Sequence, residues 1–326
     1  MKSGRSGRRG VVCVIVLLAC VAAAAAAGVA GSPADGRRGD RITALDAAIL
    51  GFIQGLTEYL PVSSTGHLIL ANYWLNLSQF SDKVGPLGRL MDKAPAVDAF
   101  DIILHLGTFL AVLGLYRGRV GQMVRGITGG DAGGRRLLAA LVIAFVPAAG
   151  AGLLFSRWIT ENLYNPVTVA AALAVGGVLM IVVEHFFWRR RKDAARVTAV
   201  DGVFYWQAAV IGAAQCLALW PGTSRSMITI LAALVVGLDM VAAAEFSFLL
   251  ALPTLGAATV YEGLKHWPDL TQSVGSDGMV IGLVVSAVVA ALAISGFVRW
   301  LTKHGLLPFG IYRLALAAAV YAYFTL

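Results

Sequence analysis

A stretch of 17 residues places acid, amide, hydroxyl and imidazole side chains together inside otherwise apolar sequence. It covers residues 54–70 and reads QGLTEYLPVSSTGHLIL. Gln54 and Glu58 are four residues apart, so on a helix they share one face, where two oxygen-bearing side chains suit a hard cation such as Mg²⁺ or Ca²⁺. Phosphate oxygens and water would have to complete the shell. A packing role for Glu58 is the alternative, but an ionisable group is costly in a membrane.

Hydroxyl groups and a histidine follow, after a proline that ends the first helix. Ser63, Ser64 and Thr65 supply hydroxyls and backbone N–H groups that can bind phosphate at the start of a new helix. Ser64 and His67 are three residues apart, so they would lie on one helix face, with the imidazole close enough to take the serine proton. Ordinary serine capping, with the histidine satisfied in the interior, is the simpler alternative.

A second polar stretch, PGTSRS at residues 221–226, also combines a charged side chain with hydroxyl groups inside apolar sequence. Arg225 stands in an apolar hairpin, where a guanidinium can hold phosphate through paired N–H donors. Its hydroxyl neighbours, which can contribute to the same phosphate site, are Thr223, Ser224 and Ser226. A snorkelling arginine or a cytoplasmic loop residue is the alternative.

Three further ionisable residues stand in the apolar segments that follow these stretches. Asp101 and Glu245 each stand early in the helix after a polar stretch, and His105 follows Asp101 by one turn. They are predicted to be either partners of Arg225 or His67, or end-of-helix charges in water.

The composition of the chain is that of a membrane protein, so we expect membrane helices to position these groups. Of the 326 residues 58% are hydrophobic and only 13% are charged, and the mean hydropathy is +0.77. Apolar runs that reach or approach the roughly 20 residues of a spanning helix recur along the chain. We therefore predict an all-α polytopic membrane protein with one membrane domain. The net charge of +8 lies in short clusters between apolar runs, so it indicates orientation and no nucleic-acid partner.

Ten apolar segments follow residue 43. Four of them form two pairs interrupted by little more than a proline, which we predict to be re-entrant helical hairpins: 44–60 with 63–77, and 203–220 with 227–238. The other six are predicted to span the membrane: 98–116, 137–155, 166–187, 241–264, 279–300 and 306–325.

The charges of the loops orient this arrangement. Three loops are rich in arginine and lysine: 117–136, 189–196 and 299–303. Three others are near neutral: 78–97, 156–165 and 265–278. With two re-entrant hairpins and six spans, all the basic loops lie on one side, which the positive-inside rule predicts to be cytoplasmic.

The two hairpins also resemble each other. AAILGFIQGLTEYLPVSST at 47–65 aligns with AAVIGAAQCLALWPGTSR at 208–225 after a one-residue gap. The aligned pairs are Gln54 with Gln215, Pro61 with Pro221, and Ser64 with Ser224. Each half, about 43–188 and about 203–326, has one hairpin and three spans, and this odd number of crossings inverts the second half. We predict an inverted-topology repeat, whose broken helices meet near the midplane and can bind an anion through their N-terminal N–H groups.

The first 42 residues stand apart from the membrane domain, which we place at 43–326. A basic start, MKSGRSGRRG, precedes an apolar run, and residues 31–43 form a polar linker. This pattern is typical of a signal peptide or an extra N-terminal helix. Cys13, Cys20 and Cys216 have no metal-ligand spacing, so neither a disulfide framework nor a zinc site is indicated.

The two polar stretches carry a family resemblance. QGLTEYLPVSSTGH resembles the (E/Q)xxxE motif with its following PVSSTGH, and ALWPGTSRSMIT resembles the PGxSRSxxT motif, of undecaprenyl-diphosphate phosphatases of the BacA/UppP type. EFSFLLALP after the second motif also fits, and the likeness covers about 43–326. It implies a bacterial cell-membrane enzyme that removes one phosphate from undecaprenyl diphosphate, recycles the carrier lipid for cell-wall synthesis, confers bacitracin resistance and uses a divalent metal.

The resemblance also assigns residue roles. It makes Glu58 essential and metal-linked, Ser64 and His67 catalytic, and Ser224 with Arg225 a phosphate-holding pair. The preferred mechanism has Ser64 attack the terminal phosphorus with His67 as base, while Arg225 and the metal stabilise charge on the phosphoryl oxygens. A nucleophilic His67, or direct attack by water, is the other possibility.

Gln54 is the permitted glutamine version of the first motif position, which weakens any claim that it is a charged ligand or a base. The expected partners are a polyprenyl diphosphate and membrane lipids, and a homodimer is a further possibility.

A function of another class competes with hydrolysis. Inverted repeats with broken helices are typical of secondary transporters, so the chain could move undecaprenyl phosphate or another anion across the membrane. Such a transporter needs groups that bind phosphate but no nucleophile with a base one turn away.

Overall fold

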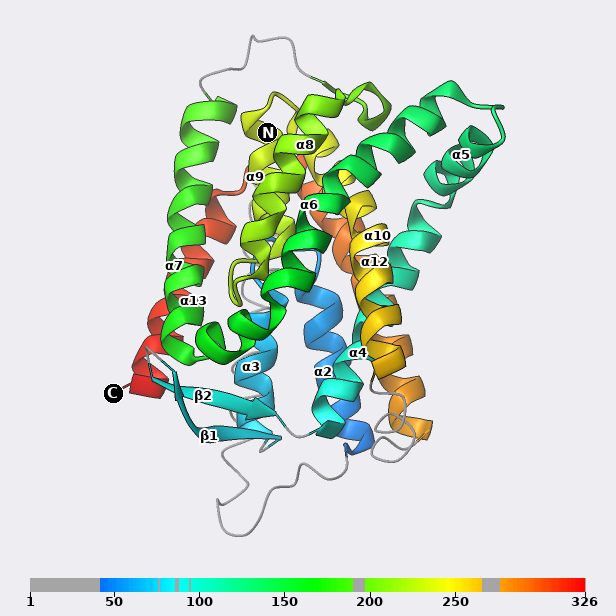
Figure 1. Ribbon diagram of the computed structural model, residues 1–326. Helices are drawn as coiled ribbons and strands as arrows, with labels where there is room; N and C mark the ends of the chain where they lie inside the picture. The colour runs from blue at the N-terminus through cyan, green and yellow to red at the C-terminus, as the bar shows by residue number, and fades with distance from the viewer. Residues whose placement is uncertain are drawn as a thin grey trace, which may run out of the picture.

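The computed structural model describes residues 42–75, 77–85, 88–93, 95–189, 197–265 and 276–325, which form a bundle of helices (Figure 1). Six helices in these ranges are long and apolar enough to cross a membrane. They are α4 (Pro95–Leu115), α6 (Ala132–Leu163), α7 (Pro166–Val183), α10 (Met240–Lys265), α12 (Ser276–Leu301) and α13 (Leu307–Thr325). These are the six predicted spans, so the predicted polytopic helical fold is confirmed. The signal peptide or extra helix predicted at the N-terminus lies outside the described residues.

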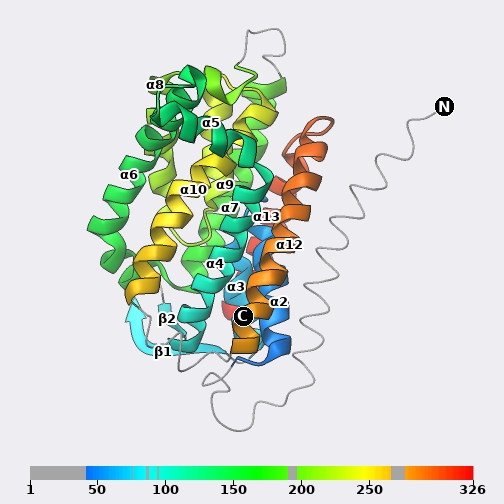
Figure 2. The ribbon, with the colours of Figure 1, turned by 90° about the vertical axis from the view of Figure 1, so that its right-hand side faces the viewer.

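Two pairs of short helices form the predicted hairpins. The first pair is α2 (Ala44–Thr57) and α3 (Ser64–Trp74), and the second is α8 (Tyr205–Gln215), extended by the 3₁₀ turn η4 (Cys216–Leu219), and α9 (Arg225–Val235). None of these helices is long enough to cross a bilayer alone, since α2 has 14 residues and α8 with η4 covers only Tyr205–Leu219. Figures 1 and 2 show α2 and α3 at one end of the bundle and α8 and α9 at the other, so the hairpins enter from opposite faces.

The two halves pack against each other reciprocally. The first half has the spans α4, α6 and α7, and the second half has α10, α12 and α13. Helix α2 packs against α12, and α8 packs against α6, so each hairpin contacts the second span of the other half. The first spans, α4 and α10, pack together, and so do the third spans, α7 and α13. This reciprocal arrangement is the packing expected of an inverted repeat.

Backbone geometry corrects the alignment of the two hairpins. Ser63 is the N-cap of α3 with φ 74° and ψ 98°, and Ser224 is the N-cap of α9 with φ 71° and ψ 116°. They are the two non-glycine residues with positive φ among the described residues. Ser224 is therefore equivalent to Ser63 and not to Ser64, because the second turn has one more residue between its proline and its helix.

Several segments that were predicted as loops contain helices or strands. The 78–97 loop contains an antiparallel hairpin of β1 (Ser78–Gly85) and β2 (Gly88–Lys93). The 117–136 loop contains α5 (Arg117–Ile127), and α6 continues to Leu163 instead of ending near residue 155. An ion pair between Arg157 and Glu161, one turn apart, supports that extension. The remaining short elements are η2 (Glu184–Arg189), a π-helix after α7, and η3 (Val200–Gly202), a 3₁₀ turn before α8.

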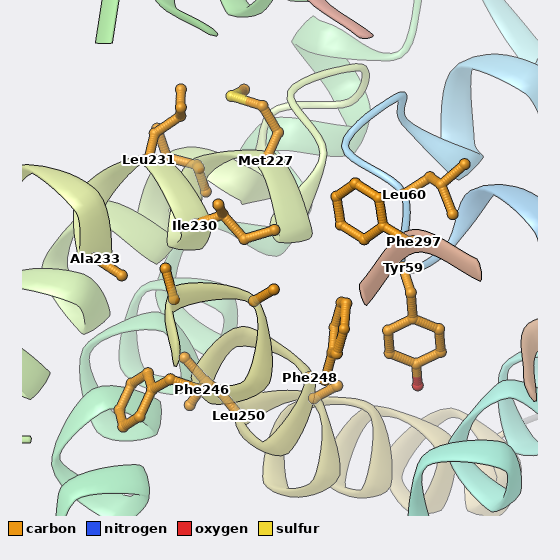
Figure 3. Packing of buried hydrophobic residues seen from close by; sticks show 14 of the residues in the cluster. Tyr59, Leu60, Met227, Ile230, Leu231, Ala233, Phe246, Phe248, Leu250 and Phe297 are labelled. Carbon is orange, nitrogen blue, oxygen red and sulfur yellow. The ribbon is translucent and has the colours of Figure 1, made fainter. Parts of the chain in front are cut away.

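Aromatic rings pack beneath the first hairpin turn (Figure 3). Tyr59 meets Phe248 edge to face, with ring centroids 5.5 Å apart, and Phe248 meets Phe297 at 6.2 Å. All three rings are buried. They connect the turn to α10 and α12, so the turn and the polar residues that follow it are held in place relative to these two helices.

The contact between α2 and α12 depends on Gly55. A Cβ atom there would lie 2.6 Å from the Ser286 carbonyl oxygen and 2.9 Å from the Val289 Cβ. We expect Gly55→Ala to lower the free energy of unfolding by about 1–3 kcal/mol, because overpacking outweighs the helix preference of alanine. Thermal unfolding of the purified protein in detergent would measure this. Gly114→Ala in α4, where a methyl group meets nothing within 4 Å, is the control, and equal unfolding temperatures for the two variants would contradict the prediction.

Candidate active site

The carboxylate of Glu58 is the centre of the site. Glu58 caps the C-terminus of α2 and is only 7% exposed. Its Oε2 accepts hydrogen bonds from Ser64 Oγ at 2.8 Å and Gln54 Nε2 at 3.1 Å. Its Oε1 accepts from Arg225 Nη2 at 3.1 Å. The carboxylate thus connects the first hairpin to the second.

The structure does not form the predicted hydrogen bond between Ser64 and His67. His67 Nδ1 lies 2.7 Å from the Ser63 carbonyl oxygen and its Nε2 lies 2.6 Å from the Tyr312 hydroxyl. A carbonyl only accepts, so Nδ1 carries the proton and Nε2 accepts from Tyr312. Helix side chains point toward the N-terminus, which directs Ser64, the first residue of α3, back to Glu58.

Arg225 is held on three sides. Besides Glu58, it donates from Nη1 to the Ser247 carbonyl oxygen at 3.1 Å, and its guanidinium carbon lies 5.6 Å from the centre of the Tyr59 ring. Its Nε is buried and has no hydrogen-bond partner. The guanidinium therefore keeps its Nε–H unpaired in the site.

Two helix N-termini meet at these side chains. Ser64 is the first residue of α3 and Arg225 is the first residue of α9, and both reach the same carboxylate. The N-terminal end of a helix carries a partial positive charge and free N–H groups. The two hairpins therefore direct two anion-attracting helix ends at one point inside the membrane.

The remaining predicted phosphate ligands divide into two groups. Ser63 and Ser226 are buried, and their hydroxyls are in use: Ser63 Oγ accepts from Gly66 N, and Ser226 Oγ donates to the Leu60 carbonyl oxygen at 2.9 Å. The other three lie at or next to the helix starts, Thr65 and Ser224 half-buried and Thr223 buried. Ser224 caps α9 through its Oγ. Ser63 and Ser226 thus hold the turns in place in this structure.

Gln54 and Glu58 form an oxygen pair that suits a divalent cation incompletely. The Gln54 side chain is buried, and its Oε1 has no hydrogen-bond partner, next to the Glu58 carboxylate. The described residues contain no cluster of three histidine, cysteine or acidic side chains that could hold a metal. A cation here would need most of its ligands from a bound substrate and water.

His105 belongs to the site in a way that the sequence did not predict. Its Nε2 lies 4.0 Å from Glu58 Oε2, and its Nδ1 donates to the Asp101 carbonyl oxygen. Glu245 pairs with Arg119 of α5 at 2.9 Å. Glu245 therefore has Arg119 as its partner in place of Arg225 or His67, and the support predicted from Asp101 stays a prediction.

Sequence reasoning missed two residues of α13. Tyr312 holds His67, as described above, and the two rings are stacked with centroids 5.7 Å apart. Arg313 is fully buried and donates to backbone carbonyls of both hairpin turns. An arginine in the middle of the apolar run LPFGIYRLALAAAV was the available signal.

Comparison with known proteins identifies the family. Residues 47–319 match the family described as bacitracin resistance protein BacA. The chain belongs to this family. It is 48% identical over 276 residues to a Sorangium cellulosum protein named undecaprenyl-diphosphatase, a match that covers 84% of each chain.

Other BacA relatives are similar over much the same length. Undecaprenyl-diphosphatase 1 of Chromobacterium violaceum is 42% identical over 275 residues, 83% of this chain and 93% of its own. The undecaprenyl-diphosphatase of Pseudomonas aeruginosa PAO1 is 41% identical over 280 residues, 86% of this chain and 93% of its own. The matched region contains both hairpins and almost all of the six spans.

The ion pair at the centre of this BacA site should be strongly coupled. Arg225→Met would leave the Glu58 carboxylate buried without its cation, and we expect a loss of about 3–5 kcal/mol in the free energy of unfolding. Adding Glu58→Leu in the same chain should recover most of that loss, because no unpaired charge then remains. Thermal unfolding in detergent would show this. Arg157→Met, at an exposed ion pair of α6, is the control and should change little; additive losses from the two site changes would exclude the coupling.

Proposed function

We propose that this protein hydrolyses undecaprenyl diphosphate to undecaprenyl phosphate and inorganic phosphate, as a multi-pass enzyme of the bacterial cell membrane. The observation that carries the proposal is the hydrogen bond from Ser64 Oγ to Glu58 Oε2. It lies beside Arg225, where the half-helices α3 and α9, the second helix of each hairpin, begin. A hydroxyl with its base and a nearby cation is the arrangement that nucleophilic phosphoryl transfer requires. The names of the BacA relatives support the same activity. Recycling of the carrier lipid for cell-wall synthesis and bacitracin resistance follow from it.

The first step transfers the terminal phosphoryl group to Ser64. Glu58 accepts the proton of the Ser64 hydroxyl as the serine oxygen bonds to the terminal phosphorus. The bond from that phosphorus to the bridging oxygen breaks, and undecaprenyl phosphate leaves with the bridging oxygen. Glu58 acts as the base in place of His67, the base predicted from the sequence, because Glu58 and not His67 contacts the serine.

The second step releases phosphate. A water molecule attacks the phosphoserine, and Glu58 returns its proton to the Ser64 oxygen as the serine–phosphorus bond breaks. Inorganic phosphate leaves with both protons of the water. The side chains of Glu58 and Ser64 are then restored.

Charge on the phosphoryl oxygens is stabilised by groups already in place. Arg225 offers its unpaired Nε, and the N-termini of α3 and α9 supply backbone N–H groups and their partial positive charge. Both ring nitrogens of His67 are engaged, so His67 orients the start of α3 and is not the nucleophile in this arrangement. Direct attack by water would not use the contact between Ser64 and Glu58, so we favour the route through a phosphoserine.

A divalent cation, Mg²⁺ or Ca²⁺, is part of the proposal. Glu58 and the unpaired Gln54 Oε1 are the residues that would hold it, together with diphosphate oxygens of the substrate. When bound, the cation neutralises charge on the diphosphate. Gln54 contributes a neutral oxygen, so Glu58 supplies the one formal negative charge of this pair.

Transport is the less favoured function. A transporter of undecaprenyl phosphate would need the anion-binding helix ends, but it has no use for a serine hydrogen-bonded to a carboxylate. Hydrolysis uses both the anion-binding helix ends and the contact between Ser64 and Glu58.

Hydrolysis can be tested by phosphate release from undecaprenyl diphosphate with the purified chain in detergent. Ser64→Ala should lower kcat by at least about 1,000-fold, because the nucleophile is lost. Arg225→Ala should lower kcat/KM by about 100-fold or more, because a donor to the transition state is lost. The matched controls are Ser295→Ala in α12, whose hydroxyl bonds its own helix, and Arg157→Ala. Full release by Ser64→Ala would exclude the serine mechanism, and no release by the folded unmodified chain would exclude the enzyme.

The metal proposal predicts a dependence on the residue at position 54. EDTA should abolish phosphate release, and Mg²⁺ or Ca²⁺ should restore it. Gln54→Glu should lower the metal concentration for half-maximal release several-fold, because a second carboxylate attracts the cation, and Gln54→Leu should raise it. Metal titrations of the three proteins would measure these values, and identical half-maximal concentrations would place the cation elsewhere.

A further inference from the structure

Arg313 is the largest fully buried side chain of the described residues. It lies within α13, one of the spanning helices, where an arginine is costly unless its donors are satisfied. No acidic side chain forms an ion pair with it in the described part of the chain. Its charge is therefore stabilised by something other than a carboxylate.

Backbone carbonyls surround the guanidinium. Nη2 donates to the Gly222 carbonyl oxygen at 2.9 Å and to that of Ala172 at 3.1 Å. Nε donates to the Leu173 oxygen at 3.3 Å and Nη1 to the Pro61 oxygen at 3.4 Å. Pro61 lies in the first hairpin turn, Gly222 lies in the second, and the other two acceptors belong to α7.

We propose that Arg313 is a positioning residue that fixes the two hairpin turns relative to each other, and thereby the contacts of Glu58 with Ser64 and Arg225. Both turns end at the N-cap of a half-helix within three residues of the carbonyls that Arg313 holds. The planar guanidinium can reach several carbonyls at fixed angles, whereas a lysine ammonium acts as a point charge. The inference rests on the hydrolysis proposed above only for its effect on rate.

Gly176 of α7 leaves the space that the guanidinium occupies. A Cβ atom on Gly176 would collide with Arg313 Nη2, and a flexible side chain moves more easily than a helix backbone. Gly176→Ala therefore displaces the guanidinium without removing its charge. It provides a second way to disturb the same contacts if changes at Arg313 itself reduce folding.

The test compares Arg313→Lys, Gly176→Ala and the double variant with the unmodified chain. The controls are Arg157→Lys, at an exposed position of α6, and Gly150→Ala, where a methyl group meets nothing within 4 Å. We expect kcat for phosphate release to fall about 10- to 100-fold in either single variant, with a smaller change in KM, because misplacing reacting groups by about 1 Å costs about that much. The second change should add less than about twofold in the double variant, because both act on one guanidinium.

Hydrogen exchange followed by mass spectrometry gives a readout independent of catalysis. Amides in both turns, near residues 61–64 and 221–225, should exchange faster in the Arg313 and Gly176 variants and not in the controls. Faster exchange confined to α7 and α13, unchanged kcat, or multiplying losses in the double variant would overturn the proposal. If the unmodified chain releases no phosphate, hydrolysis fails, and the exchange data still decide whether Arg313 fixes the turns.

Discussion

The structure depends on one carboxylate buried inside a membrane protein. Glu58 can remain there only because Ser64, Gln54 and Arg225 satisfy its two oxygens. Two of these partners begin half-helices that enter from opposite faces. The contacts that offset the desolvation of this charge therefore also join the two halves. Stability and the geometry for reaction therefore come from the same contacts.

The charges at this junction favour an anionic substrate. Glu58 and Arg225 offset each other. Arg313, which is hydrogen-bonded to both turns, adds a positive charge that no carboxylate balances in the described residues. The N-termini of α3 and α9 add their partial positive charges. An anionic substrate thus meets charges and dipoles that the folded turns already hold in place, and little reorganisation is required when charge moves during reaction.

The sequence could predict the spans and the two polar stretches because both depend on local patterns. Runs of apolar residues give the six long helices, and Pro61 and Pro221 mark the breaks of the hairpins. The partner of Ser64 could not be predicted in this way, because it depends on where α3 begins and on the turn that directs the side chain back to Glu58. The contact between His67 and Tyr312 joins residues 245 positions apart, and no spacing rule reaches that far. The alignment matched Ser64 to Ser224 because each stands three residues after a proline, whereas the backbone makes Ser63 the equivalent of Ser224, since the second turn is one residue longer.

The two serine N-caps explain why the turns need support from distant helices. A positive φ at a residue other than glycine is unfavourable, by about 1–3 kcal/mol where the conformation is imposed from outside, and both Ser63 and Ser224 adopt one. Local capping bonds from Gly66 and Met227 offset part of this cost. The rest must come from contacts across the fold: Ser226 to Leu60, Arg225 to Glu58, and Arg313 to both turns. Each of these contacts joins the two hairpins or holds both of them, so neither turn is expected to keep its conformation when the other is absent.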